Sequence, residues 1–217
     1  MRFNKLFLYA SFLFLISCNG AIVYTEFDLQ AETEAWIVQE DDFSFQMVDE
    51  NGIVNNWNLT EEDNYYSESS GTFLFIPTDK TMHEVHYQKF RSAILGDFSF
   101  SADAGFSEVN PWISFNMPHL YFEFDAVTHK PNRLYLSPNS GESFTWADYE
   151  EVDQPFDFKV VTDLEIKGDT YPEEVAVFEL IDQMGILESK SIVKFAFSKD
   201  IGLIYLELKS GLKYYRI

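Results

Sequence analysis

Cysteine is almost missing from this chain of 217 residues, in which Cys18 is the only one. A single thiol cannot form an internal disulfide, so the stability of the folded part has to come from the packing of its core. The one long apolar run, Leu6–Ile16, spans eleven residues. A helix that crosses the core of a bilayer needs about 20, so this run is too short to be a membrane-spanning helix.

Basic residues are scarce as well. The chain has 15 Lys and Arg residues against 36 Asp and Glu residues, for a formal net charge of −21. A field of this sign repels phosphate backbones, which argues against nucleic acid as a partner. It argues equally against adsorption to anionic lipid through a basic patch. Attachment to a membrane would therefore require a covalent anchor.

The first 18 residues have the pattern of a secretory signal. Arg2 and Lys5 give a positive start, the apolar run follows, and Ser17 is a small residue before Cys18. The segment Leu15–Cys18 resembles the lipobox of bacterial lipoproteins. The resemblance implies cleavage before Cys18, a diacylglycerol thioether on that residue and acylation of the new amino terminus. Two or more acyl chains anchor a protein stably, whereas one holds it only reversibly.

The residue after the cysteine bears on the membrane to which the protein is sent. In the sorting rule of enteric bacterial lipoproteins, Asp at this position retains the protein at the inner membrane. Asn19 stands there instead, which favours the outer membrane. Whether the folded part faces the periplasm or the exterior stays open, and the covalent lipid on Cys18 is the expected membrane contact.

The remaining chain has the composition and the periodicity of a β protein. Aromatic residues make up 18%, dominated by Phe and Tyr, which favour strands. Apolar and polar residues alternate in Phe43–Met47, in Phe98–Ser101 and through residues 113–125, and Thr72–Ile76 is a short run with the character of a buried strand. Asn51-Gly52 indicates a hairpin turn after the first of these strands.

The C-terminal third has the clearest pattern. One long strand is expected over Phe156–Ile166, followed by strands at 174–181, 191–198, 203–209 and 212–216 with short turns between them. Successive strands with short turns form an antiparallel meander. We therefore predict an all-β fold, an antiparallel meander that forms a half-open barrel or a sandwich, after a cleaved N-terminal signal peptide.

Two segments are ambiguous. Thr81–Ile94 fits a helix or a strand, and we favour the strand because its neighbours are strands; Leu29–Val38 carries the same ambiguity. The expected organisation is a signal peptide over 1–17, an N-terminal β region over 18–150 and a C-terminal β-meander over 151–217. The acidic stretch Asp148–Pro155 is the candidate boundary, and one continuous domain over 18–217 is the alternative.

A family resemblance covers about residues 156–217. The segment Phe195–Ile204 combines an aromatic strand, a charged turn and Gly-Leu-Ile, and Lys167–Tyr171 leads into Val175–Phe178. These features resemble uncharacterised bacterial envelope lipoproteins, whose domains are similar to the half-open barrels of the lipoprotein carriers LolA and LolB. The resemblance implies a curved antiparallel sheet around a hydrophobic ligand, and it names no residue that would bind one.

The sharpest enzymatic pattern is Glu123-Phe124-Asp125-Ala126-Val127-Thr128. Carboxylates two residues apart on a strand share a face at about 7 Å, a separation that glycosidases use. The string resembles the Glu-x-Asp-x-x-Glu strand of laminarinase-like glycosidases, but Thr128 replaces the final acid, the proton donor of that motif. The alternative is the polar face of a strand whose other face, Leu120, Phe122 and Phe124, is core. We predict no enzyme and no catalytic residue.

Metal and sugar sites have weaker support. His83 and His86 are three apart, which puts them on opposite faces of a strand and is the wrong spacing for a zincin helix. We predict no metal site and no cofactor. Trp57 and Trp146 lie in polar stretches and are candidates for stacking on a sugar, whereas most aromatic residues in β proteins belong to the core.

Three functions are compatible with this sequence. The first is a non-enzymatic ligand-binding or carrier lipoprotein of the envelope with a hydrophobic ligand, which predicts a cavity lined by residues such as Phe158, Val160, Val177 and Phe195. The second is a structural or accessory subunit of an envelope complex, which predicts an exposed apolar patch or a long unpaired strand edge. The third is a carbohydrate-active protein.

Overall fold

The structure is a computed structural model. It describes residues 24–38, 44–73, 76–105, 110–136, 145–148, 156–181, 187–199 and 201–217, and for 69–73, 76–79 and 145–148 it describes the backbone alone. The predicted signal peptide and Cys18 lie outside these residues. No helix in the described part of the chain is long and apolar enough to cross a membrane.

The described chain is nearly all strand, with one short helix, which confirms the predicted all-β class. Its elements are β1 (Tyr24–Phe27), α2 (Ala31–Glu34), β2 (Ser44–Asp49), β3 (Val54–Phe73), β4 (Ile76–Ser92), β5 (Gly96–Asp103), β6 (Trp112–Met117), β7 (Leu120–Asp125), β8 (Pro131–Leu136), β9 (Thr145–Asp148), β10 (Phe156–Val161), β11 (Leu164–Ile166), β12 (Asp169–Tyr171), β13 (Val175–Leu180), β14 (Ile192–Ser198), β15 (Gly202–Leu208) and β16 (Lys213–Arg216).

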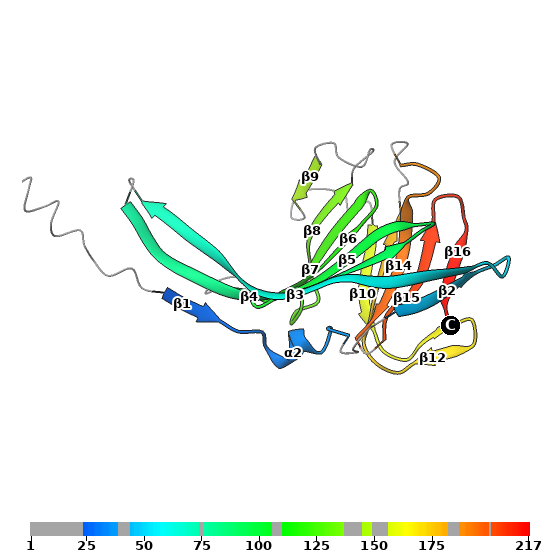
Figure 1. Cartoon of the computed structure of the whole chain (residues 1–217), viewed down its shortest axis with the longest axis horizontal. Coiled ribbons are helices and arrows are strands. Elements are labelled where there is room, and N and C mark those ends of the chain that lie inside the picture. The colour runs from blue at the N-terminus through cyan, green and yellow to red at the C-terminus, as the bar shows by residue number, and fades with distance from the viewer. Residues whose placement is uncertain are drawn as a thin grey trace, which may run out of the picture.

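One sheet of 14 strands contains all but the β11–β12 pair. Its order is β10-β13-β14-β15-β16-β2-β3-β4-β5-β6-β7-β8-β9, and β1 joins it beside β4. Every pair in the main path is antiparallel, and the C-terminal strand β16 pairs with β2 through Tyr214 and Asp49. The sheet curls into a nearly closed barrel-like body, from which β3 and β4 extend far to one side (Figure 1).

The inner face of the curled sheet is packed with aromatic side chains. The predicted alternation is confirmed here, since Phe98, Phe100, Phe115, Phe122 and Phe124 all belong to one buried cluster. That cluster also contains Phe156, Phe178, Phe195 and Phe197 from the C-terminal strands. Burying an aromatic or large aliphatic side chain contributes roughly 1.5–3 kcal/mol, so this cluster is the main source of stability in a domain without disulfides.

Aromatic contacts across the inner space hold the curl. The ring of Phe122 on β7 lies 4.8 Å from both Phe158 on β10 and Phe178 on β13, between ring centroids. Phe124, also on β7, lies 4.9 Å from Phe158. Because β10 is one end of the sheet and β7 lies near the other, these contacts join the two ends without backbone hydrogen bonds between them.

The segment after α2 contributes to the same core. Trp36 is fully buried and packs edge-on against Phe124, with ring centroids 5.3 Å apart. The ambiguous segment Leu29–Val38 thus contains one helical turn followed by a buried tryptophan. The other ambiguous segment is resolved as predicted, because β4 covers Thr81–Ser92.

The long strand predicted over Phe156–Ile166 is wrong in one respect. It breaks after β10 at Thr162 and Asp163, where Asp163 adopts a left-handed backbone with φ of 54°. The chain then forms the β11–β12 hairpin, whose central residues Lys167 and Gly168 both have positive φ, as a type I′ turn requires. This hairpin covers a second, smaller apolar cluster on the outer face of the sheet, around Val175 and Ile204.

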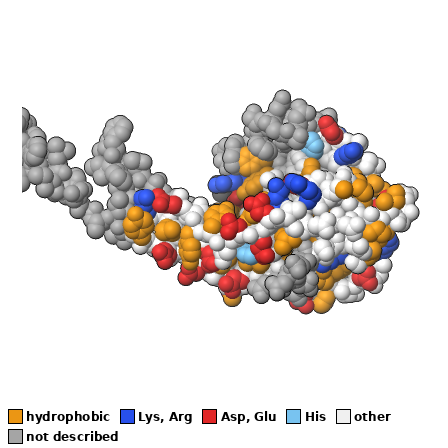
Figure 2. Space-filling model, viewed as in Figure 1, with side chains coloured by type: hydrophobic (Ala, Val, Ile, Leu, Met, Phe, Trp, Pro, Cys, Tyr) orange, Lys and Arg blue, Asp and Glu red, His pale blue; other side chains and the backbone are white. Residues whose placement is uncertain are grey.

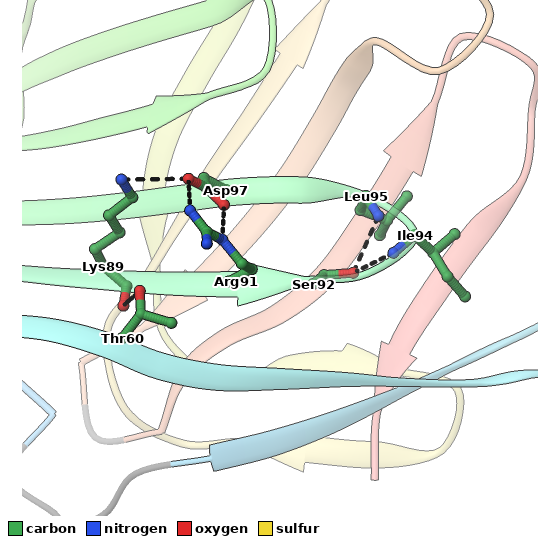
Figure 3. Close-up of polar contacts among 7 residues, drawn as sticks. All are labelled: Thr60, Lys89, Arg91, Ser92, Ile94, Leu95 and Asp97. Carbon is green, nitrogen blue, oxygen red and sulfur yellow. Dashed lines mark hydrogen bonds and ion pairs between the residues drawn. The ribbon is translucent and has the colours of Figure 1, made fainter.

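The β4–β5 hairpin is fixed by polar contacts at its turn (Figure 3). The hydroxyl oxygen of Ser92 accepts hydrogen bonds from the backbone N–H groups of Ile94 and Leu95, at 3.1 and 3.0 Å, and donates one to Asn55 on β3 at 2.8 Å. The guanidinium of Arg91 donates two hydrogen bonds to the carboxylate of Asp97, at 2.8 and 3.0 Å. These contacts fix the register of β3, β4 and β5 at the end of β4 that lies opposite to the arm.

Beyond the body, β3 and β4 form a projecting arm. We use this name for residues 66–84 of β3 and β4 together with β1. The pairing of β4 with β5 ends at Val85, and from Lys80 to His83 the free edge of β4 is taken by β1 in parallel. The polar residues of this part of β3 gave no strand signal in the sequence, because a strand that is wet on both faces needs no apolar alternation.

The segment predicted as one strand, Thr72–Ile76, is divided between two strands in the described part of the chain. Thr72 and Phe73 end β3 and Ile76 begins β4, and Phe73 and Ile76 form the last pair of the ladder. A short apolar run gives no periodicity by which one strand can be told from two. Residues 74 and 75, and the predicted burial of this segment, lie outside what the structure describes.

We expect Phe122→Ala to lower the free energy of unfolding by about 3–5 kcal/mol, since a fully buried ring that joins the sheet ends would leave a cavity. Urea unfolding followed by near-ultraviolet circular dichroism measures this change. The matched control is Ile181→Ala, because Ile181 is 68% exposed and should shift stability by no more than about 0.5 kcal/mol. Equal effects of the two substitutions would contradict the role given to Phe122.

Candidate functional site

Titratable side chains gather on the outer face of β4 to β8, opposite the aromatic core. Cross-strand register puts Asp103 opposite Trp112, and Trp112 opposite Asp125. In the neighbouring row Ser114 pairs with Glu123, which in turn pairs with Arg133. We call Asp103, Glu123, Tyr121 and His83 the outer-face cluster. It brings together groups from three strands, β4, β5 and β7.

Asp103 is the most perturbed carboxyl of the cluster. The residue is 5% exposed, and its side chain accepts a hydrogen bond from the backbone N–H of Gly105 at 2.9 Å. Burial, reinforced by the negative charge of Glu123, raises the pKa of Asp103 to about 7 against the opposing effect of the Gly105 bond. Nε2 of His83 lies 3.3 Å from the carboxyl, and burial lowers the pKa of that imidazole. Near neutral pH this pair holds a proton that an ordinary aspartate would have lost.

A second aspartate on the same face of the same strand behaves in the opposite way (Figure 3). Asp97 is bound by Arg91, and its carboxylate lies 3.2 Å from Nζ of Lys89. The hydrogen bond from Arg91 and the two cations lower the pKa of Asp97 to about 2, despite some desolvation. The contrast with Asp103 shows that burial away from Lys and Arg, and not the strand itself, keeps the proton on Asp103.

Glu123 occupies the centre of the cluster. It is 4% exposed, the hydroxyl of Tyr121 donates a hydrogen bond to it at 2.9 Å, and Nε of Arg133 lies 3.9 Å away. Burial raises the pKa of Glu123, although Tyr121 and Arg133 oppose the rise. Burial and the Glu123 charge also raise the pKa of Tyr121. The Glu123 carboxyl is therefore buried, although the polar face of a strand, to which its sequence pattern assigned it, is commonly exposed to solvent.

Asp125 has a structural role. Its carboxylate accepts hydrogen bonds from the backbone N–H groups of Val127 and Thr128, at 2.9 and 2.7 Å, and from the side chain of Asn110 at 2.6 Å. Burial raises its pKa, but these bonds outweigh that effect and lower the pKa overall. Asp125 thus caps the turn after β7, as Asx side chains commonly do. Glu123 and Asp125 therefore lie in different environments and do not form a pair of equivalent carboxylates.

The two histidines of β4 point to opposite faces, as their spacing predicted. His83 joins the outer-face cluster, whereas Nε2 of His86 lies 3.3 Å from Glu62 on the other face of β4. Within the described residues no group of three or more His, Cys, Asp or Glu side chains has the arrangement of a metal site.

The predicted sugar-stacking tryptophans are not found as a platform. Trp57 is fully buried and stacks on Phe45 in the core, with ring centroids 5.8 Å apart, so its proposed exposure is wrong. The reason is that Trp57 lies on the inner face of β3, at the point where that strand is still part of the body. The side chain of Trp146 lies outside the described residues. Trp112, half-buried beside His83, is the tryptophan that the fold brings to the cluster.

The four residues expected to line a carrier cavity do not share a face. Phe158, Val160 and Phe195 pack on the inner face with the aromatic core, whereas Val177 packs with the outer cluster under the β11–β12 hairpin. Phe195 is fully buried, and its ring centroid lies 5.0 Å from that of Phe115. Side chains of the core therefore occupy the space that these residues surround.

The comparisons with known proteins give no relative. No family model matches the chain, and neither a curated protein nor a solved structure matches it. The function has to be argued from the residues and their arrangement alone.

Sequence reasoning found Glu123, Asp125 and His83 but missed Asp103. The alternation that puts Phe98 and Phe100 in the core also puts Ser101 and Asp103 on the outer face. This pattern could have identified Asp103 as a residue of the outer face. Only the fold shows that Asp103 approaches Glu123, because the two are brought together across β6. Chemically, the cluster can exchange a proton near neutral pH and hydrogen-bond a hydroxyl-rich or cationic ligand.

We expect Asp103→Asn to flatten the pH dependence of stability between about pH 4 and pH 7. The folded state binds the Asp103 proton more tightly than the unfolded state, so wild-type stability falls as pH rises through this window, by at most about 1.4 kcal/mol per pH unit. The lowered pKa of His83 works in the opposite direction in acid, so the difference between variant and wild type is the quantity to measure. Urea unfolding at pH 4.5, 6 and 8 provides it.

The free energy of unfolding of Asp103→Asn should increase relative to that of wild type as pH rises. Asp97→Asn is the matched control: it removes a carboxylate whose pKa is lowered, so its stability difference from wild type should stay nearly constant over the same range. A pH-independent difference for Asp103→Asn would contradict the raised pKa.

Proposed function

We propose that this chain is a bacterial envelope lipoprotein, tethered through acyl chains on Cys18, whose barrel-like body serves as a non-enzymatic binding or accessory subunit. The observation that carries the tether is the sequence Leu15-Ile16-Ser17-Cys18 at the end of a charged start and a short apolar run. The strongly acidic chain offers no basic patch as an alternative means of attachment. Asn19 favours the outer membrane.

The form of the body supports an accessory subunit over a carrier. A carrier needs space for a hydrophobic ligand, and the inner face is instead occupied by ring contacts such as those of Phe122 with Phe158 and Phe178. Contacts with a partner would then lie on outer surfaces. The projecting arm supplies one of these, and Figure 2 shows hydrophobic and acidic side chains along its visible face.

The tether is tested in cells. We expect globomycin to accumulate the uncleaved precursor and Cys18→Ser to move the protein from the membrane pellet to the soluble fraction, because both block the acyl attachment. A wild-type protein processed normally under globomycin, or a Cys18→Ser variant that still sediments with membranes, would contradict the proposal. Ser17→Ala is the matched control, since Ala is equally small and should leave processing and sedimentation unchanged.

A second candidate function is carbohydrate-active chemistry at the outer-face cluster. The glycosidase motif has an acid as proton donor where this chain has Thr128. Asp103, with a pKa of about 7 that the charge of Glu123 helps to raise, could supply that proton instead. Glycan hydrolysis that is lost in both Glu123→Gln and Asp103→Asn, but retained in the exposed Asp157→Asn, would favour this function. Hydrolysis that is absent, or equal in all four proteins, would exclude it.

A further inference from the structure

The projecting arm is longer than the packing of the body requires. The nine residues Ile76–Glu84 of β4 lie beyond the last pair with β5, and at about 3.4 Å per residue they reach roughly 30 Å from the body. Of those whose side chains the structure describes, Lys80–Glu84, none belongs to the main aromatic core, and many described side chains of this part of β3 are exposed. A ribbon of this length, kept outside the core, is expected to act on something at a distance from the body.

The N-terminal segment is fastened along this arm. β1 pairs in parallel with β4, so that Tyr24 lies opposite Lys80 and Phe27 opposite His83. The backbone N–H of Leu29 donates a hydrogen bond to Glu84 at 2.9 Å, and the hydroxyl of Tyr66 donates one to Asp28 at 2.6 Å. The first described residue therefore has a fixed place on the outer half of the arm (Figure 1).

This placement limits where acyl chains on Cys18 can lie. Cys18 precedes Tyr24 by six residues, which span at most about 20 Å when fully extended. Because β1 and β4 are parallel and β4 starts at the far end, the amino-terminal end of β1 points toward that end. Lys80 is only four residues from Ile76, so the end lies about 14 Å from Tyr24 along the strand. The far end of the arm is thus within reach of the anchor.

The chemistry of the arm changes along its length. Its shaft has a net negative charge, with Glu26, Glu68, Asp79 and Glu84 against the single cation Lys80, whereas the ten residues from Ser69 to Thr78 contain no charged residue. Phe73 and Ile76, both apolar, form the last pair of the ladder. Tyr24, which is 55% exposed, belongs to the residue types enriched at the interface between lipid and water. An uncharged end on an acidic shaft suits shallow entry into lipid and opposes deeper entry.

We propose that the arm points at the bilayer and that its end, marked by the Phe73–Ile76 pair, enters the lipid interface beside the acyl chains on Cys18. This inference rests on the lipidation proposed above. The arm then holds the body, with its outer-face cluster, at a set distance from the membrane surface. It also fixes the orientation of the body, which a flexible tether alone would leave free.

The test uses the full-length lipoprotein, purified and reconstituted into vesicles. Thr72→Cys places a thiol beside the Phe73–Ile76 pair, and Ile181→Cys places one on the exposed surface of the body as the control. Each is labelled with a maleimide dye whose emission is quenched by brominated lipids. Wild type should take up no dye, because its only thiol carries lipid, and flotation of the vesicles reports the anchor separately.

We expect both labelled proteins to float and brominated lipids to quench the dye at residue 72 but not at residue 181. Adding Phe73→Asp should lower the quenching at residue 72 about ten-fold, since a charged side chain is disfavoured in the acyl region, while flotation stays complete. Adding Tyr65→Asp, which puts the same charge in place of an exposed aromatic side chain at the base of the arm, should leave the quenching unchanged.

The outcomes separate the two proposals. Floating protein without quenching at residue 72 would overturn this inference, leave the anchor intact and favour a protein partner for the arm. Equal quenching at both positions would also overturn it, because the body would then lie on the membrane. Protein that takes up dye at Cys18 and does not float would overturn the lipid anchor and this inference with it.

Discussion

The structure depends on the packing of aromatic rings across the inside of one curled sheet. Phe122 and Phe124 on β7 contact Phe158 on β10, and no backbone ladder joins these strands. Hydrogen bonds fix each strand to its neighbours, and within the described residues ring contacts pack the two ends of the sheet against each other. In a chain without a disulfide, the closed shape is therefore a property of the core.

Because the core occupies the inner face, the candidate functional features lie on the outer surface of the described part of the protein. Buried aromatic rings that contact one another fill the inner face, and the outer-face cluster and the arm lie outside this core. These two regions differ in the physics they use. The cluster relies on burial, which keeps a proton on Asp103 near neutral pH, whereas the arm relies on length and on a change from acidic to uncharged residues.

The arm includes the N-terminal strand β1, which pairs with β4. β1 replaces β5 as the neighbour of β4 where the body ends, so the arm keeps three strands beyond Val85. Two-stranded ribbons in water are marginally stable, and a third strand supports them. β1 is thus the segment that supports the arm, and Trp36, further along the same stretch of chain, packs in the core.

By itself the sequence determined the strand class, most of the core and the candidate tether. The alternation of Phe98, Phe100, Ile113 and Phe115 with polar residues is a local signal, because a strand shows its two faces within a few residues. The lipobox around Cys18 is local in the same way. The tertiary structure decided which strand neighbours which, that Trp57 is buried, that Asp103 approaches Glu123 across β6, and that Thr72–Ile76 marks the end of an arm. These features depend on how far a strand continues past its neighbours and on what covers each face, and such long-range packing leaves no period in the sequence.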